Sequence, residues 1–373
     1  MNSLLSEEQY RDFSRRVFEK TSRDHLPLKV QFEITYRCNI HCVHCYTDPF
    51  NNPIHLRKEL TLDEMLKIFD ELAKAGVLWM LLTGGEAFVH PQFKRIYREA
   101  KARGFIVSLF SNATTVTDDL LDFLAEDPPF NLEVSCHGAT QEIFDKITQV
   151  PGSFNRFKEG VRKIISRGLP LKVKTKAMSV NRNELSQIKS FIEDLGLKFN
   201  LYNRIYPRLN GDLSSTLYRL SGKEIAELEY EGTLAGSGKA VETTSEDNIC
   251  AVEDVSSRFT PPADDRLFRC GCGGNSITIN PYGILRPCTF TVWPTYDLKV
   301  IPFREAFDQL VQTIRNARYT GDSACKICSA YMLCDKNPAI AVYETGSMEA
   351  PVPYFCETAF SKQARLEPSR PSK

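Results

Sequence analysis

Two different spacings of hydrophobic and polar residues alternate between residues 30 and 205. Six short runs have the apolar character of strands, and longer stretches between them place apolar residues three or four positions apart, as amphipathic helices do. Thr61 and Gly76 bound the first helical stretch as N-cap and C-terminal stop. The expected strands are 30–36, 77–83, 105–112, 131–136, 171–178 and 198–205, and the expected helices are 61–76, 92–103, 118–126, 154–167 and 184–195. This alternation predicts an α/β fold, a partial six-unit TIM-like barrel with parallel strands and right-handed crossovers.

On three of the expected strands, every second side chain is polar and the side chains between them are apolar. The apolar faces should pack against the helices. Branched apolar residues normally fill the lumen of a barrel, so a polar inner face favours a cavity that holds a ligand. The alternative is that some of these side chains face solvent at an open sheet edge. The polar positions are Glu33, Thr35 and Arg37; Glu133, Ser135 and His137; and Lys172, Lys174 and Lys176.

The chain changes character after residue 206. The next stretch is rich in Gly, Ser, Thr and Asp, which predicts a connector, with one helix expected at 221–230. Beyond it the chain is loop-rich and cysteine-rich, and its end resembles a frayed tail. The expected organisation is an N-terminal extension (1–29), the partial barrel (30–206), the connector (207–265), a cysteine-rich domain (266–362) and the tail (363–373).

Composition excludes several classes of function. Apolar residues make up 42% and charged residues 25%, as in an ordinary globular protein. Lys plus Arg number 47 and Asp plus Glu number 47, so no overall basic field exists to hold nucleic acid or an anionic membrane. The longest apolar run, 75–82, is too short to cross a bilayer. The first residues mix charges throughout and lack the layout of a signal peptide, so we expect a cytoplasmic location.

Cysteine is the compositional outlier. Twelve cysteines in a chain expected to stay in the reducing cytosol favour metal binding or redox chemistry over disulfides. Three lie at 38, 42 and 45, and seven lie between 270 and 356. Cys136 and Cys250 stand apart. Cys136 alternates with Val134, so we expect it to be buried against the helices, and Cys250 is interpreted as a bystander in the connector.

The first cysteine cluster follows the first expected strand directly, with the spacing C-x3-C-x2-C. Zinc sites usually take four ligands in two pairs, and no fourth cysteine lies nearby. Three thiolates on a four-iron cluster leave one iron open to another ligand, which is an arrangement for chemistry rather than for electron storage alone.

This spacing resembles the signature of the radical S-adenosylmethionine (AdoMet) superfamily, with His44 at its aromatic position. Gly84-Gly85-Glu86, at the end of the second expected strand, resembles the GGE motif of the same family. The resemblance implies that AdoMet binds the open iron of a 4Fe–4S cluster and is cleaved by one electron to a 5′-deoxyadenosyl radical. That radical would then abstract hydrogen from the substrate, while the protein aligns the reactants and excludes water.

The resemblance also implies residues that contact AdoMet, each of which has an alternative interpretation as a turn former or a solvated side chain. Lys176 is the expected partner of the AdoMet carboxylate. The expected contacts are His44, Gly84, Gly85, Glu86, Ser111, Asn112, Ser135, Lys176 and Asn181, and the expected ligands of the cluster are Cys38, Cys42 and Cys45.

The second group of cysteines resembles the SPASM extension of radical AdoMet enzymes, which carries auxiliary 4Fe–4S clusters. The resemblance assigns Cys325, Cys328, Cys334 and Cys356 to one cluster and Cys270, Cys272 and Cys288 to the other. Pro338 stands where the family can place a further cysteine, so the latter cluster has an open iron unless Cys270 or Cys250 completes it. Zinc is the alternative metal for this region.

The predicted function is therefore radical AdoMet chemistry on a peptide or protein, as in the maturation of a ribosomally made peptide by crosslinking, thioether formation, epimerisation or oxidation. A tetrapyrrole-modifying enzyme of the haem pathway, an activator of another enzyme and a non-catalytic cluster carrier remain alternatives. A sulfatase-maturating enzyme is another, although Thr289 stands where that class has Asp. Few residues precede the first strand, so we expect no fused peptide-recognition domain. Either a separate recognition protein presents the peptide, or the lumen and the connector bind it directly. The resemblance also implies an electron donor such as flavodoxin or ferredoxin. The catalytic base is unassigned, with Glu33, Glu133 and Tyr202 as candidates in the lumen.

Overall fold

The computed structural model describes residues 7–47, 53–231, 264–269 and 273–366. One curved sheet of nine strands organises these residues, in the order β6-β5-β4-β3-β2-β1-β7-β8-β9. The seven strands from β6 to β7 are parallel to their neighbours, and β8 and β9 continue the sheet in antiparallel pairing. The strands are β1 (Lys29–Thr35), β2 (Trp79–Gly84), β3 (Ile106–Ser111), β4 (Asn131–Ser135), β5 (Leu171–Lys176), β6 (Phe199–Tyr202), β7 (Ser276–Ile279), β8 (Ile284–Arg286) and β9 (Tyr296–Asp297).

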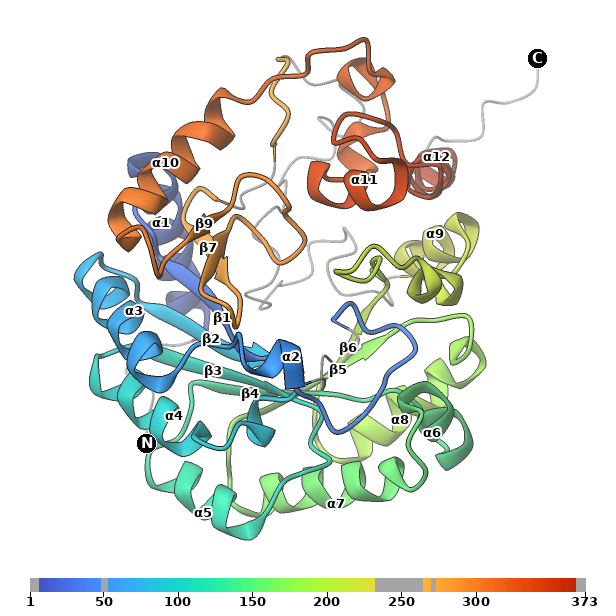
Figure 1. The fold of residues 1–373 in the computed structure, drawn as a ribbon. Helices are drawn as coiled ribbons and strands as arrows, with labels where there is room; N and C mark the ends of the chain where they lie inside the picture. The colour runs from blue at the N-terminus through green and yellow to red at the C-terminus, as the bar shows by residue number, and fades with distance from the viewer. Residues whose placement is uncertain (1–6, 48–52, 232–263, 270–272, 367–373) are drawn as a thin grey trace.

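Helices surround the outer face of this sheet, as Figure 1 shows. The helices between the first six strands are α3 (Leu62–Lys74), α4 (Phe93–Ala102), α5 (Asp118–Glu126), α6 (Gln141–Thr148), α7 (Ser153–Ser166) and α8 (Leu185–Asp194). The remaining helices are α1 (Glu7–Asp24), α2 (Pro53–Leu56), α9 (Gly222–Tyr230), α10 (Phe303–Asn316), α11 (Pro338–Thr345) and α12 (Pro353–Leu366). None of the described helices is both long and apolar enough to cross a membrane.

The predicted six strand–helix units are confirmed, in the predicted order. On β1 the side chains of Phe32 and Ile34 are fully buried and join the core that the strands share with the outer helices. Cys136 is buried in this same core, as expected. The cap of α3 is also confirmed, because the Thr61 side chain accepts from the Glu64 backbone N–H while the Glu64 carboxylate accepts from Thr61.

The structure is more regular than expected after residue 266. Strand β7 pairs in parallel with β1, with Ile277 opposite Val30, so the sheet extends beyond the six predicted strands. Helix α10 buries Phe303, Phe307 and Leu310 in the core of the barrel. Strands as short as β7 to β9 show too little periodicity to be found from the pattern alone.

Both ends of the described chain are also more helical than expected. Helix α1 occupies much of the region interpreted as an N-terminal extension, and α12 continues to Leu366, four residues into the expected tail. The helix expected at 221–230 is confirmed as α9, with Ser221 as its N-cap.

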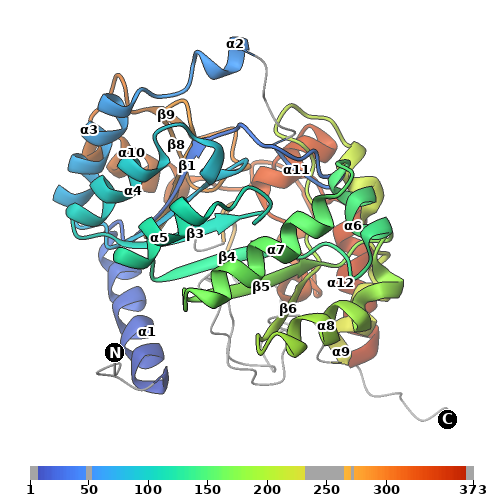
Figure 2. The same cartoon turned by 90° about the horizontal axis from the view of Figure 1, so that it is seen from below.

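Helix α9 packs against α12, and the two lie side by side in Figures 1 and 2. A Cβ atom on Gly222 would lie 2.7 Å from the Thr358 backbone nitrogen, so the two helices approach at a point where only glycine fits. The connector helix is thereby fixed to the last helix of the described chain.

Candidate functional site

The loop that carries Cys38, Cys42 and Cys45 leaves β1 at the carboxyl edge of the parallel strands. The backbone N–H groups of His41 and Val43 donate to carbonyls in the last turn of α6, each at 2.9 Å. The Arg208 guanidinium donates to the carbonyls of Cys45 (3.1 Å) and Val43 (3.4 Å). The loop is therefore held from both sides through its backbone.

Each of the three sulfur atoms has a side-chain polar group within reach. Thr47 Oγ1 lies 3.0 Å from Cys45 Sγ, and His137 Nε2 lies 3.8 Å from Cys42 Sγ. Asn112 Nδ2 donates to Cys38 Sγ at 3.8 Å. Asn112 follows β3 and His137 follows β4, so the ends of neighbouring parallel strands supply two of these groups.

The chemistry of this donor set fits an iron–sulfur cluster. Burial raises the pKa of the Cys38 thiol to about 12 and that of Cys42 well above its usual value, so bare thiols here stay protonated and a metal is needed to hold them as thiolates. In the parts of the chain that the structure describes, no three His, Cys, Asp or Glu side chains converge as ligands of a single metal ion. Three soft donors spread over a loop suit a cluster of several metals.

The glycine pair at the end of β2 lets two backbone segments meet. Gly85 N donates to the Thr35 carbonyl at 2.9 Å, and Glu86 N donates to the Arg37 carbonyl at 2.8 Å. A Cβ atom on Gly84 would lie 2.0 Å from the Thr35 oxygen, and one on Gly85 would lie 2.2 Å from the Arg37 oxygen. The close approach is therefore to the end of β1 and the start of the cysteine loop, which no local pattern in the sequence indicated.

The Glu86 side chain is fully buried and connects the ends of β2 and β3. Its carboxylate accepts from Asn112 N at 2.6 Å and from Phe88 N at 3.1 Å. Burial is the main reason that the pKa of Glu86 rises to about 7. These contacts fix Asn112, and through it the polar group nearest Cys38.

The remaining residues predicted to contact AdoMet lie along the same edge of the sheet. His44 is enclosed, and its ring packs 5.1 Å from that of His137. The Asn181 amide donates to the carbonyls of His137 and Lys176, both at 2.9 Å, and accepts from Met178 N at 2.8 Å. Asn181 thus shapes the wall of the site through backbone contacts.

Three other predicted contacts have their own surroundings. Ser111 Oγ accepts from Ala113 N at 2.9 Å. Ser135 is half-buried at the end of β4. The Lys176 ammonium lies 5.6 Å from the centre of the Tyr202 ring. All nine predicted contacts lie on or next to the ends of β2 to β5 or on the cysteine loop, and their contact with AdoMet stays a prediction.

A second buried carboxylate, Glu33, lies on the inner face of β1. It accepts from Tyr36 Oη at 2.7 Å, from Gln31 Nε2 at 3.2 Å and from Tyr46 Oη at 3.4 Å. Thr289 Oγ1, next to Cys288, lies 3.4 Å away. Burial raises the pKa of Glu33. Because β1 lies between β2 and β7, the open-edge interpretation does not apply to this side chain.

The other polar inner faces form contacts of their own. Lys174 pairs with Glu133 across β5 and β4 at 2.5 Å, and its ammonium lies 3.3 Å from the centre of the Phe110 ring. A charged and aromatic wall thus continues from β3 to β5 on the inner side of the sheet.

The cysteines of the C-terminal region gather around a cation. Cys334, Cys356 and Cys325 interact electrostatically, and so do Cys356 and Cys328. Burial and these neighbours raise the pKa of the Cys334 thiol to about 12. Burial lowers the pKa of Lys336, and the nearby Cys325, Cys334 and Cys356 side chains act in the opposite direction. These electrostatic interactions link the four thiols assigned to one cluster, and their role as ligands stays a prediction.

The second predicted ligand set is described only in part. Cys288 Sγ lies 3.1 Å from Thr291 Oγ1. Cys270 and Cys272, the other predicted members of this set, and Cys250 lie outside the described residues.

The sequence placed His137 on a polar inner face but indicated no contact with the cysteine loop, and Thr47 and Arg208 were not predicted as parts of the site. His137 continues the polar alternation of β4, and Thr47 lies two residues after Cys45, so both carried a weak local signal. Arg208 carried none, because its contact spans more than 160 positions of the chain.

Comparison with known proteins agrees with this geometry. The family model of the Radical SAM superfamily matches residues 32–195. The subtilosin biosynthesis protein AlbA of Bacillus subtilis is 26% identical over 70% of this chain and 55% of its own length. The AdoMet-dependent heme synthase of Methanosarcina barkeri is 24% identical over 88% of this chain and 96% of its own. The mycofactocin maturase MftC of Mycobacterium ulcerans is 24% identical over 86% and 85%.

Solved structures share the fold. Streptococcus suis SuiB bound to S-adenosylmethionine superposes with a TM-score of 0.63 and 13% identity, over 95% of this chain and 82% of that one. The same protein bound to its precursor peptide SuiA gives a TM-score of 0.64 at 13% identity, over 93% and 80%. The curved sheet with its outer helices is thus a fold that this chain shares with SuiB.

Proposed function

Because the family model of the Radical SAM superfamily matches residues 32–195, we propose that this protein is an enzyme that uses AdoMet to abstract hydrogen from a peptide and so matures it. Cys38, Cys42 and Cys45 hold a 4Fe–4S cluster in this proposal. The single observation that carries it is the convergence of the three-cysteine loop, the Gly84-Gly85-Glu86 turn and the ends of β3 and β4 at one edge of a parallel sheet.

The bound cluster and AdoMet supply a one-electron reductant and a source of a carbon radical strong enough to break an unactivated C–H bond. The chain's own residues hold and enclose these groups. The three thiolates bind iron, His44 and His137 close the apolar side of the loop, and Glu86 fixes the backbone at Asn112. Enclosure matters here because a radical must be kept from water and from side reactions.

A peptide substrate is supported by the relatives and by the inner wall of the sheet. AlbA and MftC are named for the biosynthesis of subtilosin and mycofactocin, and SuiB has been solved with a precursor peptide. The wall combines two carboxylates, Glu33 and Glu133, with Lys174 and the Phe110 ring. Such a mixture suits a chain of polar and apolar side chains better than a purely apolar ligand.

A tetrapyrrole is the second candidate substrate, and one observation favours it. The heme synthase matches 88% of this chain and 96% of its own length, so the two proteins share nearly their whole extent. The basic side chains of the wall would then face the carboxylates of the tetrapyrrole.

Auxiliary clusters and partners complete the proposal. Cys325, Cys328, Cys334 and Cys356 bind one further cluster, and Cys288 binds another together with Cys270 and Cys272. A flavodoxin or ferredoxin supplies electrons, and a separate protein presents the peptide. The cytoplasmic location expected from the sequence stays a prediction.

Anaerobic reconstitution tests the proposal. With iron, sulfide, dithionite and AdoMet, we expect the protein to release 5′-deoxyadenosine and to hold about twelve iron atoms per chain for three clusters. Short peptides encoded beside the gene and a porphyrin are then offered in parallel and analysed by mass spectrometry. A mass change in a peptide supports the proposal, and a change only in the porphyrin selects the second candidate. A colourless sample that releases no deoxyadenosine contradicts both.

A further inference from the structure

Three neutral side chains approach the three sulfur atoms of the cysteine loop, one to each sulfur. Asn112 donates to Cys38, His137 Nε2 faces Cys42, and Thr47 Oγ1 faces Cys45. A thiolate bound to iron carries no proton and only accepts hydrogen bonds. The hydroxyl of Thr47 and the ring of His137 are therefore the donors once the metal is bound.

The surroundings of His137 fix which ring nitrogen carries the proton. The ring is buried between His44 and Phe144, at centroid distances of 5.1 Å and 5.5 Å. Its Nδ1 has no hydrogen-bond partner among the described residues. A neutral ring with the proton on Nε2 directs its one N–H group at Cys42.

This arrangement differs from that of a cysteine in the C-terminal region. Cys334 Sγ lies 3.8 Å from the Phe355 carbonyl, a group that only accepts hydrogen bonds. In the N-terminal loop, each of the three sulfurs has a neighbouring side chain that can donate a hydrogen bond.

Hydrogen bonds donated to the sulfurs of an iron–sulfur cluster stabilise its more negative state and raise its reduction potential. Resting on the proposed function, we propose that Asn112, His137 and Thr47 set the reduction potential of the cluster on Cys38, Cys42 and Cys45 by donating one hydrogen bond to each sulfur. The couple takes up one electron from a one-electron reductant, and no bond in the protein forms or breaks. These neutral side chains act on the charge of the cluster through hydrogen bonds, and the proposal assigns them no contact with the peptide substrate.

Redox titration of the full-length holoenzyme tests this, with dithionite as reductant and electron paramagnetic resonance as readout. The signal that changes on addition of AdoMet identifies the cluster with the open iron. We expect His137→Phe and Thr47→Val to move its midpoint to more negative potential. At the midpoint of the wild type, the ratio of reduced to oxidised cluster should fall about tenfold, which is 59 mV for a one-electron couple.

Two sets of variants separate hydrogen bonding from packing. His137→Gln and Thr47→Ser keep a donor near the same sulfur, and their midpoints should stay near the wild type. Thr291→Val removes a hydroxyl from beside Cys288, at a distance close to that between Thr47 and Cys45, and should leave the AdoMet-sensitive signal unchanged. Thr47→Val keeps the shape of the side chain, so it decides the outcome if His137→Phe fails to assemble.

The outcomes distinguish this inference from the proposed function. A wild type that assembles no cluster overturns both. A wild type with an AdoMet-sensitive cluster whose midpoint is the same in Thr47→Val and His137→Phe, at full iron content, overturns the inference alone. An equal shift in His137→Phe and His137→Gln also overturns it, because packing rather than the donor would then set the potential.

Discussion

The two sulfur-rich regions of the molecule differ in the groups that surround their thiols. Neutral donors surround Cys38, Cys42 and Cys45, and two of these donors stand at the ends of parallel strands. In the C-terminal region, Cys325, Cys328 and Cys334 lie between α10 and α11 and Cys356 lies in α12, and three of these thiols interact electrostatically with the Lys336 ammonium. A parallel sheet brings strand ends together by its geometry, whereas a loop-rich region needs other contacts to hold its shape.

Ion pairs centred on the buried side chains of Asp335 and Lys362 supply those contacts. Asp335, next to Cys334, pairs with Arg204 at 2.6 Å and with Lys362 at 3.3 Å, and Lys362 also pairs with Glu229 at 2.7 Å. This network joins the chain after β6, the connector helix α9 and the last helix α12. The barrel therefore positions its thiols through hydrogen bonds of the backbone, whereas the C-terminal region positions them through ion pairs.

The largest expected effect separates the chemical roles of the two regions. We expect Cys42→Ala to lose about four iron atoms per chain and to release 5′-deoxyadenosine no faster than a protein-free control. Cys328→Ala should also lose about four iron atoms and yet still cleave AdoMet. Iron analysis and chromatography of deoxyadenosine measure both. Equal loss of AdoMet cleavage in the two variants would contradict the division of roles.

The next effect tests the role of charge in the C-terminal region. Arg219 and Glu344 form a buried two-pronged pair at 2.7 and 2.9 Å, and Arg219 Nε donates to the Ile205 carbonyl at 2.8 Å. Removing one partner leaves a buried charge, so Arg219→Ala should lower the free energy of unfolding in urea by about 3–5 kcal/mol.

Its control is the exposed helical pair of Arg304 and Asp308. Arg304→Ala should cost below about 0.5 kcal/mol, because solvent screens such pairs. Similar losses of unfolding free energy in Arg219→Ala and Arg304→Ala would show that burial of the charge does not determine how much an ion pair stabilises the protein.

A smaller effect tests the role of backbone in the barrel. Gly85→Ala should lower the free energy of unfolding by about 3 kcal/mol, because its Cβ meets the Arg37 carbonyl oxygen at 2.2 Å and the strand ends must separate. In the C-terminal region, Gly346 ends α11 at φ +75° with open space around it. Gly346→Ala should cost only the left-handed conformation, about 1–2 kcal/mol. Equal losses of unfolding free energy in Gly85→Ala and Gly346→Ala, measured in urea, would argue against a close backbone approach at Gly85.

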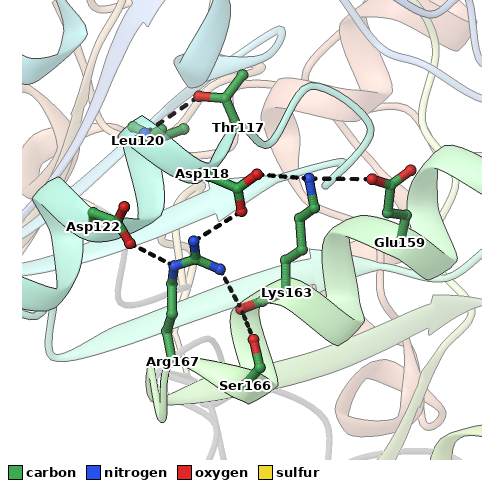
Figure 3. Close-up of polar contacts among 8 residues, drawn as sticks. All are labelled: Thr117, Asp118, Leu120, Asp122, Glu159, Lys163, Ser166 and Arg167. Carbon is green, nitrogen blue, oxygen red and sulfur yellow. Dashed lines mark hydrogen bonds and ion pairs between the residues drawn. The ribbon is translucent and has the colours of Figure 1, made fainter.

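The smallest effect lies outside both regions. An exposed network on α5 and α7 joins Asp118, Lys163, Glu159, Arg167 and Asp122 (Figure 3). Lys163→Ala should leave the thermal midpoint within about 2 °C of the wild type and should not change AdoMet cleavage, since exposed pairs contribute little. A large change in the thermal midpoint or in AdoMet cleavage would show that this surface network is a third region important for the protein.

The sequence allowed the barrel to be predicted because its signals are local. Alternation on strands such as 30–36 and caps such as Thr61 appear within a few residues. The added strand β7 was not predicted, because four residues carry little periodicity and its pairing with β1 is set by tertiary contact. Helix α10, with a clear apolar stripe, was missed because the cysteines around it suggested loops.

The candidate site, like the fold, combines features that short motifs predict with contacts that arise only in the folded chain. The cysteine spacing and the glycine pair lie in short motifs, so the edge of the sheet that carries them could be predicted. The contact of Thr289 with Glu33 spans 256 positions, and no short-range pattern encodes it. The approach of His137 to Cys42 depends on how β4 and the loop after β1 are placed in space, which only the folded sheet determines.

The pairing of β1 with β7 has a consequence for synthesis of the protein. The chain is made from its N-terminus, so β1 keeps an unpaired edge on the ribosome until residues 276–279 have emerged. An unpaired edge is a template for association with other chains. Release of a truncated product that ends before β7 would therefore expose the strand that leads into the cysteine loop, and chaperones have reason to hold the nascent chain until its last quarter arrives.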